Sequence, residues 1–207
     1  MPDSVVAETR SRIFVLNCLE CVAAIFRGPD ADAWVRLIEE GLPELIARDP
    51  AVFPNVTRAL RKLQSALLPD AIPDLTLLET EFVRLFIAGR GGTVAPPYES
   101  CHQPHTAPRT MAEPAQNMRR LLDAAGLAPD SNEPPDHLAL ELEFLYHLLA
   151  TSWSQNQPDL EQQARSFAAK TLTDWLPRFI VALDKGNAHP VYIAAAELAG
   201  AVAEVLA

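Results

Sequence analysis

Two groups of histidine, cysteine and carboxylate side chains have the residue types that bind metals. In the first group, Glu99, Cys101, His102 and His105 lie within seven residues. A structural zinc site usually takes several cysteines and histidines at short, fixed spacings, and this segment has a single cysteine and no such spacing. We therefore predict that these are exposed polar residues of a loop rather than metal ligands.

The second group, His137, Glu141, Glu143 and His147, falls on a predicted long helix. His137 and Glu141 are four residues apart and share a face, as do Glu143 and His147, but the two pairs point in different directions. The H-E-x-x-H and E-x-x-H spacings, which place ligands on one side of a metal, do not occur in this group. The pattern predicts ion pairs on the helix surface.

No set of catalytic side chains is recognisable. Ser100 is not part of a G-x-S-x-G turn, and nothing marks a strand before it. The glycines between Gly89 and Gly92 do not form a phosphate loop, because no Gly-Lys-Ser/Thr follows them and the helix precedes them. We therefore predict no catalytic residues, no metal and no cofactor.

Two proline-stiffened corners remain as candidates for binding. They are Pro96-Pro97-Tyr98-Glu99-Ser100 and Pro134-Pro135-Asp136-His137. One interpretation is that the aspartate of the second corner caps the long helix beside a surface histidine. The other is that both corners face one groove that binds an extended or helical peptide. Leu85 and Phe86 would then supply apolar contact, and the two carboxylates would attract basic side chains.

Apolar residues recur at intervals of three and four residues along most of the chain, and no window shows the alternation of a strand. The sequence therefore predicts an all-α protein. Prolines and glycines mark the boundaries between the helices. The expected helices are 5–26, a second one capped by Asp30 or Asp32 with a break near Gly41-Leu42-Pro43, 56–67, one from Pro73 to Phe86, 111–122 with Gly126 as its stop, one from 138, one from Pro158 with a kink or restart at Pro177, and 190–205.

The expected organisation is a single helical domain of about eight or more helices. An N-terminal helical part, 1–125, contains a long loop at 89–110. A polar, proline-containing connection at 126–136 forms a hinge, and 137–207 forms the C-terminal helical part. The two parts can be two sub-bundles joined by this connection.

Composition and charge limit the class of protein. The 207 residues carry 17 basic and 27 acidic side chains, a net charge of −10, which argues against general nucleic-acid binding. Neither a secretory leader nor an apolar run of about 18 residues is visible, so we expect a cytoplasmic protein without a membrane span. Cys18 and Cys21 form a C-x-x-C within a helical pattern, which favours buried thiols over a redox pair.

Three segments with distinctive residues occur in order along the chain. The first runs from Phe82-x-x-Leu85-Phe86 to the first corner, and the second reads E-P-P-D-H-x-x-x-E-L-x-F from Glu133. The third is Phe167-x-x-x-x-Leu172-x-x-Trp175-x-Pro177-x-Phe179. Together, over roughly residues 10 to 200, they resemble the TorD/DmsD family of redox-enzyme maturation chaperones.

The resemblance implies an all-helical cytoplasmic protein without enzymatic turnover. Members of the family bind the twin-arginine signal peptide or the apo core of a molybdopterin oxidoreductase, assist insertion of its bis-molybdopterin guanine dinucleotide cofactor, and delay its export. One departure is that the third motif often carries a histidine before its leucine, where this chain has Lys170-Thr171, so any role of that histidine is in doubt. By position, the resemblance assigns client binding to Leu85, Phe86, Pro97, Tyr98, Glu99, Ser100, Asp136 and His137.

Two other functions stay open on the sequence. One is a metal-dependent enzyme with an unrecognised site in the Cys101-His102-His105 loop, and the other is a generic helical adaptor without a client peptide. We expect a monomer or a domain-swapped dimer, because long loops such as 89–110 permit exchange of helices between protomers.

Overall fold

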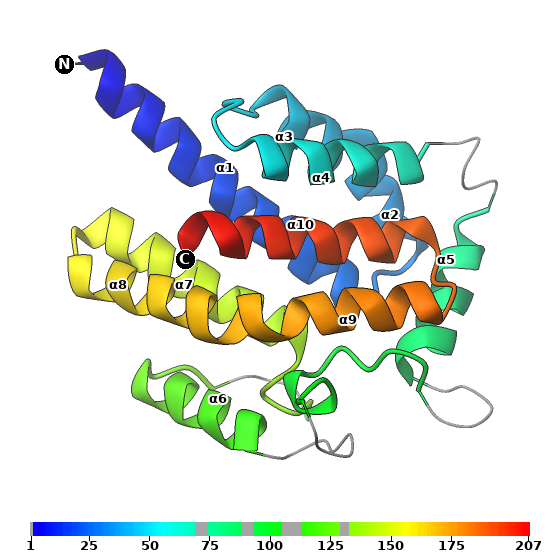
Figure 1. Ribbon diagram of the computed structural model, residues 1–207. Helices are drawn as coiled ribbons and strands as arrows, with labels where there is room; N and C mark the ends of the chain where they lie inside the picture. The colour runs from blue at the N-terminus through cyan, green and yellow to red at the C-terminus, as the bar shows by residue number, and fades with distance from the viewer. Residues whose placement is uncertain (1, 69–73, 88–92, 105–112, 129–132) are drawn as a thin grey trace.

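The computed structural model describes residues 2–68, 74–87, 93–104, 113–128 and 133–207, and the chain in these ranges is helical (Figure 1). This confirms the predicted all-α class. The one extended pairing among these residues is a single bridge between Tyr98 and His137. The predicted Gly89–Gly92 break, the predicted helix start at Pro73 and His105 lie outside the described ranges.

The described part of the chain contains ten α-helices and four short turns of π- or 3₁₀-helix. They are α1 Pro2–Phe26, α2 Ala31–Arg36, η1 Leu37–Gly41, α3 Leu42–Ala47, α4 Pro54–Ala66, α5 Thr76–Phe82, η2 Val83–Ile87, η3 Glu99–Cys101, α6 Glu113–Ala124, α7 Leu138–Gln155, α8 Pro158–Phe167, η4 Ala168–Leu172, α9 Thr173–Lys185 and α10 Pro190–Leu206.

Local sequence signals explain most of these boundaries. Asp30 caps α2, because its side chain accepts a hydrogen bond from the Ala33 amide at 2.8 Å. Prolines open α4, α8 and α10, where their missing N–H groups leave no helical hydrogen bond unmade. The predicted break near Gly41 takes the form of a π-turn, η1, that separates α2 from α3, with Pro43 in the first turn of α3. The predicted interruption at Pro177 lies earlier, at η4.

Helix α10 lies at the centre of the bundle and packs against α4, α9 and α1, while α1 packs against α7, and α7 against α8 (Figure 1). Alanines fill most of the buried positions of α10, which lets the backbones of its neighbours approach closely. Helices from both sides of the 126–136 connection therefore share one hydrophobic core. The division of the chain at this connection stays a prediction. In the described residues, no helix is long and apolar enough to cross a membrane.

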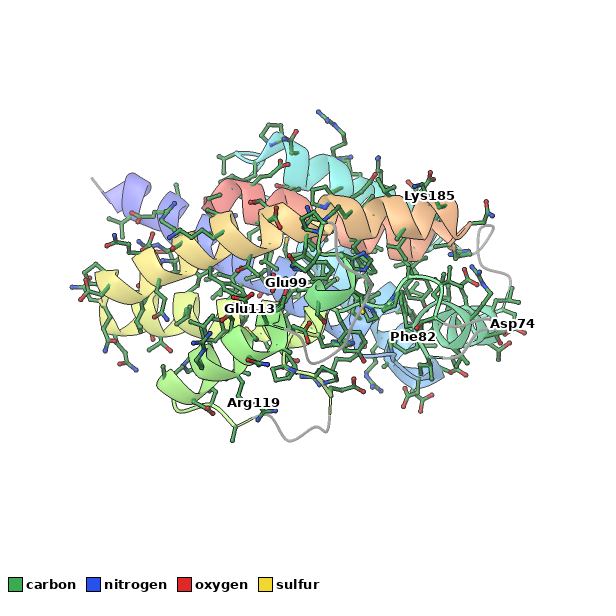
Figure 2. The ribbon with its side chains drawn as sticks, turned by 60° about the horizontal axis from the view of Figure 1, so that its bottom comes forward. Asp74, Phe82, Glu99, Glu113, Arg119 and Lys185 are labelled. Carbon is green, nitrogen blue, oxygen red and sulfur yellow. The ribbon has the colours of Figure 1, made fainter. Side chains whose placement is uncertain are left out.

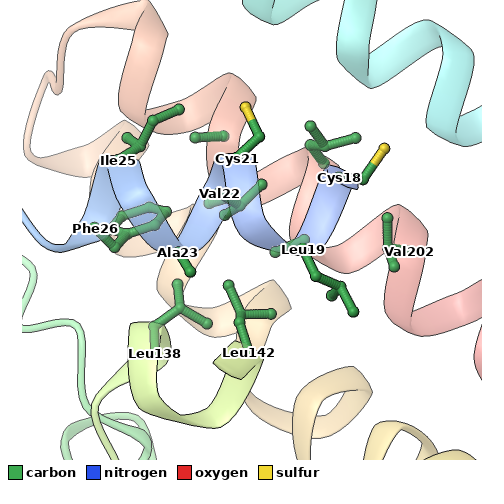
Figure 3. Packing of buried hydrophobic residues seen from close by; sticks show 14 of the residues in the cluster. Cys18, Leu19, Cys21, Val22, Ala23, Ile25, Phe26, Leu138, Leu142 and Val202 are labelled. Carbon is green, nitrogen blue, oxygen red and sulfur yellow. The ribbon is translucent and has the colours of Figure 1, made fainter. Parts of the chain in front are cut away.

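The two cysteines of α1 are buried free thiols, as predicted. Both sulfurs lie on the side of α1 that faces away from Leu138 and Leu142 of α7 (Figure 3). Burial raises the pKa of the Cys21 thiol to about 12 and that of the Cys18 thiol further. The thiolate is the reactive form, so these side chains behave as small apolar core residues.

Gly28 ends α1 in a left-handed conformation with φ of +74°, close to the ring of Phe82. A Cβ at this position would lie 2.7 Å from Phe82 Cε1. We expect Gly28→Ala to lower the free energy of unfolding by about 2–4 kcal/mol, through left-handed backbone strain and overpacking. Gly126 is the matched control, because its φ is +70° but nothing lies within 4 Å of its Cβ position. Urea denaturation should show a loss of only about 1 kcal/mol for Gly126→Ala, and equal losses would contradict the steric explanation.

Candidate functional site

The two proline-stiffened corners lie side by side. The Glu99 amide donates to the Asp136 carbonyl at 3.0 Å, and the Leu138 amide donates to the Pro97 carbonyl at 2.8 Å. These two bonds form the bridge between Tyr98 and His137, whose rings are 5.1 Å apart, edge to face. The expected meeting of the two corners, which lie far apart in the sequence, is therefore confirmed.

The buried Asp136 side chain of the second corner is hydrogen-bonded to the first corner. It has no exposed surface, and its Oδ2 accepts the Ser100 amide at 2.9 Å. The interpretation of Asp136 as the cap of the long helix beside a surface histidine is wrong. His137 is buried and caps α7 itself, because its Nδ1 accepts the Ala139 amide at 3.2 Å. Burial lowers the pKa of His137 to about 4, so the ring is neutral near pH 7.

Three carboxyl groups converge beneath the first corner: Glu99, Asp136 and Glu141. Glu99 is half-buried on η3, at the centre of the view in Figure 2, and accepts a hydrogen bond from the Gln103 amide at 3.0 Å. Glu141 is fully buried, its Oε2 accepts the indole N–H of Trp175 at 3.0 Å, and the charge of Glu99 acts on its carboxyl group. Two carboxylates close to each other repel, which favours a proton on one of them.

Burial and mutual repulsion hold this cluster partly protonated. Burial is the main cause, and the charge of Asp136 the second, that raises the pKa of Glu99 to about 7. Burial is also the main cause, and the charge of Glu99 the second, that raises the pKa of Glu141 well above its ordinary value. Within the described residues, three buried oxygens of the site have no hydrogen-bond partner: Ser100 Oγ, Asp136 Oδ1 and Glu141 Oε1. The site therefore combines these buried oxygens with the half-exposed carboxylate of Glu99.

The prediction of ion pairs on the surface of α7 is confirmed for one residue of the group. Glu143 pairs with Arg27 of α1, whose Nε donates to Oε1 at 2.8 Å while Nη2 contacts Oε2, whereas Glu141 faces the core. From the spacing alone, His137 and Glu141 were predicted to share one solvent-facing side of α7. In the fold that side meets η3 and α9, so both residues are buried.

The apolar residues predicted to contact a peptide belong to the core of this structure. Leu85 has no exposed surface and Phe86 is 5% exposed. The Phe86 ring packs against the rings of Phe26, Tyr192 and Phe82, with centroids 5.7, 5.3 and 5.0 Å away. Pro97 and Ser100 are buried as well. Among the eight predicted residues, only Tyr98 and Glu99 are partly accessible.

Tyr98 anchors the outer side of the site. Its hydroxyl donates to Glu133 Oε2 at 2.6 Å, which links the first corner to the residue that opens the second. Burial, followed by this bond to Glu133, raises the pKa of Tyr98 above its ordinary range. The phenol therefore remains a hydrogen-bond donor at neutral pH.

His102 is a residue of the site whose role the sequence did not reveal. It is buried, donates from Nε2 to the Pro96 carbonyl at 2.7 Å, and stacks on Trp175 with the ring centroids 5.6 Å apart. Its backbone carbonyl accepts a bond from Arg178 of α9. Burial lowers its pKa. The expectation of an exposed loop residue was therefore wrong, and His102 fixes η3 against α9.

The structure offers no support for the metal-site alternative within the described ranges. No group of three or more histidine, cysteine, aspartate or glutamate side chains there is arranged to hold a metal ion. Cys101 is half-buried, and burial raises the pKa of its thiol. The described residues of this loop thus hold the corner together.

Comparisons with known proteins identify relatives of this chain. Residues 49–181 match a family model described as the nitrate reductase delta subunit. The chain is 36% identical over 154 residues to the chaperone protein TorD of Vibrio cholerae serotype O1, covering 70% of this chain and 68% of the relative. It is 30% identical over 163 residues to the chlorate reductase assembly chaperone protein of Ideonella dechloratans, covering 76% and 70%.

A solved structure shares the fold. The crystal structure of a protein from Archaeoglobus fulgidus, described as a candidate redox enzyme maturation protein, has a TM-score of 0.51 to this chain at 21% identity. The match covers 88% of this chain and 90% of the other. At this identity the likeness concerns the fold alone, whereas the family rests on the sequence matches. The chain thus belongs to the TorD and nitrate reductase delta subunit family of redox-enzyme maturation chaperones.

Proposed function

We propose that this protein binds the catalytic subunit of a molybdopterin oxidoreductase, through its twin-arginine signal peptide or its apo core, assists insertion of the cofactor and delays export. Support comes from the names of the relatives, which are the chaperone TorD and assembly chaperones for chlorate and selenate reductases. The observation that carries the proposal is the joining of two corners into one site above a buried carboxyl cluster.

The accessible part of the site suits a basic peptide. Glu99 and Tyr98 are the groups that a client can reach, while Asp136, His137, Ser100 and Pro97 hold them in place from below. Leu85 and Phe86 act in this proposal as the packed support of the first corner. An arginine of a client would form a charge-assisted hydrogen bond with Glu99, which contributes roughly 1.5–3 kcal/mol when well formed.

Binding of a cation to Glu99 should release a proton. The pKa of Glu99 is about 7, so this carboxyl group is partly protonated at neutral pH. A guanidinium beside it favours the ionised form and lowers this pKa. We therefore expect a twin-arginine peptide to bind with proton release and with an affinity that weakens as salt increases.

Isothermal titration calorimetry tests this expectation at about pH 7, in two buffers with different ionisation enthalpies. The observed binding enthalpy should differ between the buffers for the wild-type protein. A peptide with both arginines replaced by glutamine should bind at least about ten-fold more weakly. Binding that is insensitive to salt and to the arginines would contradict a role for this site in recognising the basic part of a client.

A further inference from the structure

A groove outside the corner site lies along the packed pair α1 and α7. Its volume is about 330 Å³. The floor is apolar, formed by buried residues of both helices, and the mouth carries two carboxylates and a tyrosine. The lining residues are Leu19, Glu20, Ala23, Ala24, Leu142, Glu143 and Tyr146. We call this hollow the α1–α7 groove.

Small side chains between larger contacts create this space. The two helices are antiparallel, because Arg12 lies over the ring of Trp153 near one end while Arg27 pairs with Glu143 near the other. Between these contacts α1 presents Ala23 and Ala24, whose side chains are too short to fill the gap. Figure 3 shows Ala23 pointing towards Leu138 and Leu142 of α7, and Leu142 is a lining residue of the groove.

The charge at the mouth of the groove is negative. The ionisable lining residues are the glutamates Glu20 and Glu143 and the phenol of Tyr146. Glu143 is compensated by its two contacts with Arg27. Glu20 is exposed, and no ion pair to it occurs within the part of the chain that the structure describes. An uncompensated carboxylate next to an apolar floor complements a peptide in which a basic residue neighbours an apolar one.

The α1–α7 groove lies along α7, the helix that begins at the second corner. Glu143 follows His137 by six residues of α7, a rise of about 9 Å along the helix. Glu143 itself lines the groove, and its carboxylate pairs with Arg27 of α1. A peptide in extended conformation needs roughly three residues to cover that distance.

We propose that the α1–α7 groove is a second contact for the client polypeptide. It takes an apolar side chain over Ala23 and Ala24, and Glu20 binds a neighbouring lysine or arginine of the same segment. This inference rests on the proposed function. It adds a site on α1, whereas the residues assigned to client binding above all lie in the η2 segment and the two corners.

Two substitutions at exposed positions test the groove. Ala24→Trp fills it, and Glu20→Lys reverses its free charge. Their controls are Ala7→Trp on the same helix and Glu40→Lys on η1, both at exposed positions away from the groove. The probe is a synthetic peptide with two adjacent arginines followed by an apolar stretch, titrated calorimetrically into the full-length chain.

We expect Ala24→Trp and Glu20→Lys each to weaken binding by about ten-fold, with the controls within about two-fold of wild type. Wild-type affinity in both groove variants, with binding still lost in Asp136→Ala, would overturn the groove and leave the proposed function intact. Absence of peptide binding to the wild-type protein would overturn both. If Ala24→Trp fails to fold, Glu20→Lys alone decides between these outcomes.

Discussion

Replacement of Asp136 by alanine is expected to lower the free energy of unfolding by about 1–3 kcal/mol, because it leaves the buried amide of Ser100 without an acceptor. Asp136 has no exposed surface, and its Oδ2 lies 2.9 Å from that amide. Asp136→Asn retains an oxygen at this position and should keep most of the stability. With the corner loosened, Asp136→Ala should also lose binding of the client peptide, since Glu99 then has no fixed position.

The pKa of Glu99 provides a second, independent test of the role of Asp136. The charge of Asp136 raises the pKa of Glu99. Both Asp136→Asn and Asp136→Ala should therefore lower the pKa of Glu99 from about 7 towards its ordinary value, as measured by carboxyl-carbon NMR titration. Glu40→Ala on η1 is the control, because it removes an exposed carboxylate from an element that packs against α2 and α3. If Asp136→Asn costs as much stability as Asp136→Ala in urea, the hydrogen bond to Ser100 is not the cause.

Features set by local chemistry could be predicted from the sequence. Proline in a first helical turn and glycine with positive φ act over a few residues, so the start of α8 at Pro158 and the stop of α6 at Gly126 follow from the sequence. The meeting of the two corners was predicted because each has a stiff backbone that presents polar groups beside prolines. The family resemblance added which segments belong together in the fold.

Features set by tertiary contacts could not be predicted in this way. Glu141 occupies a helix position that suits a surface ion pair, and only the packing of Trp175, 34 residues further on, shows that it is buried. The amphipathic pattern that includes Leu85 and Phe86 describes an apolar face without showing whether core or client covers it. Likewise, aspartate caps helices more often than histidine, so the capping role of His137 ran against the statistical preference.

The pH dependence of stability should separate the carboxyl cluster from the buried histidine. His137, with its pKa lowered to about 4, binds a proton more readily when unfolded, so its contribution makes stability rise with pH up to about 6.5. Glu99, with its pKa raised to about 7, holds a proton in the folded state that the unfolded chain releases above about 4.5. Its contribution is fully present below that pH and is lost as pH rises through 7.

Above about pH 7.5 the unfolded histidine has lost most of its proton as well, so the carboxyl groups dominate the pH dependence. There the wild-type free energy of unfolding should fall with pH, by at most about 1.4 kcal/mol per unit for each proton retained.

Glu141→Gln keeps an acceptor for the Trp175 indole and lets its amide donate to ionised Glu99, so the fall of stability with pH should flatten. Because the His137 contribution is common to both proteins, the difference between their urea-derived stabilities from about pH 5 to 8 isolates the contribution of the Glu99 and Glu141 carboxyl groups. Glu40→Gln, the same change at an exposed position, should retain the wild-type slope. A Glu141→Gln slope as steep as that of the wild-type protein would mean that Glu99 and Glu141 titrate independently.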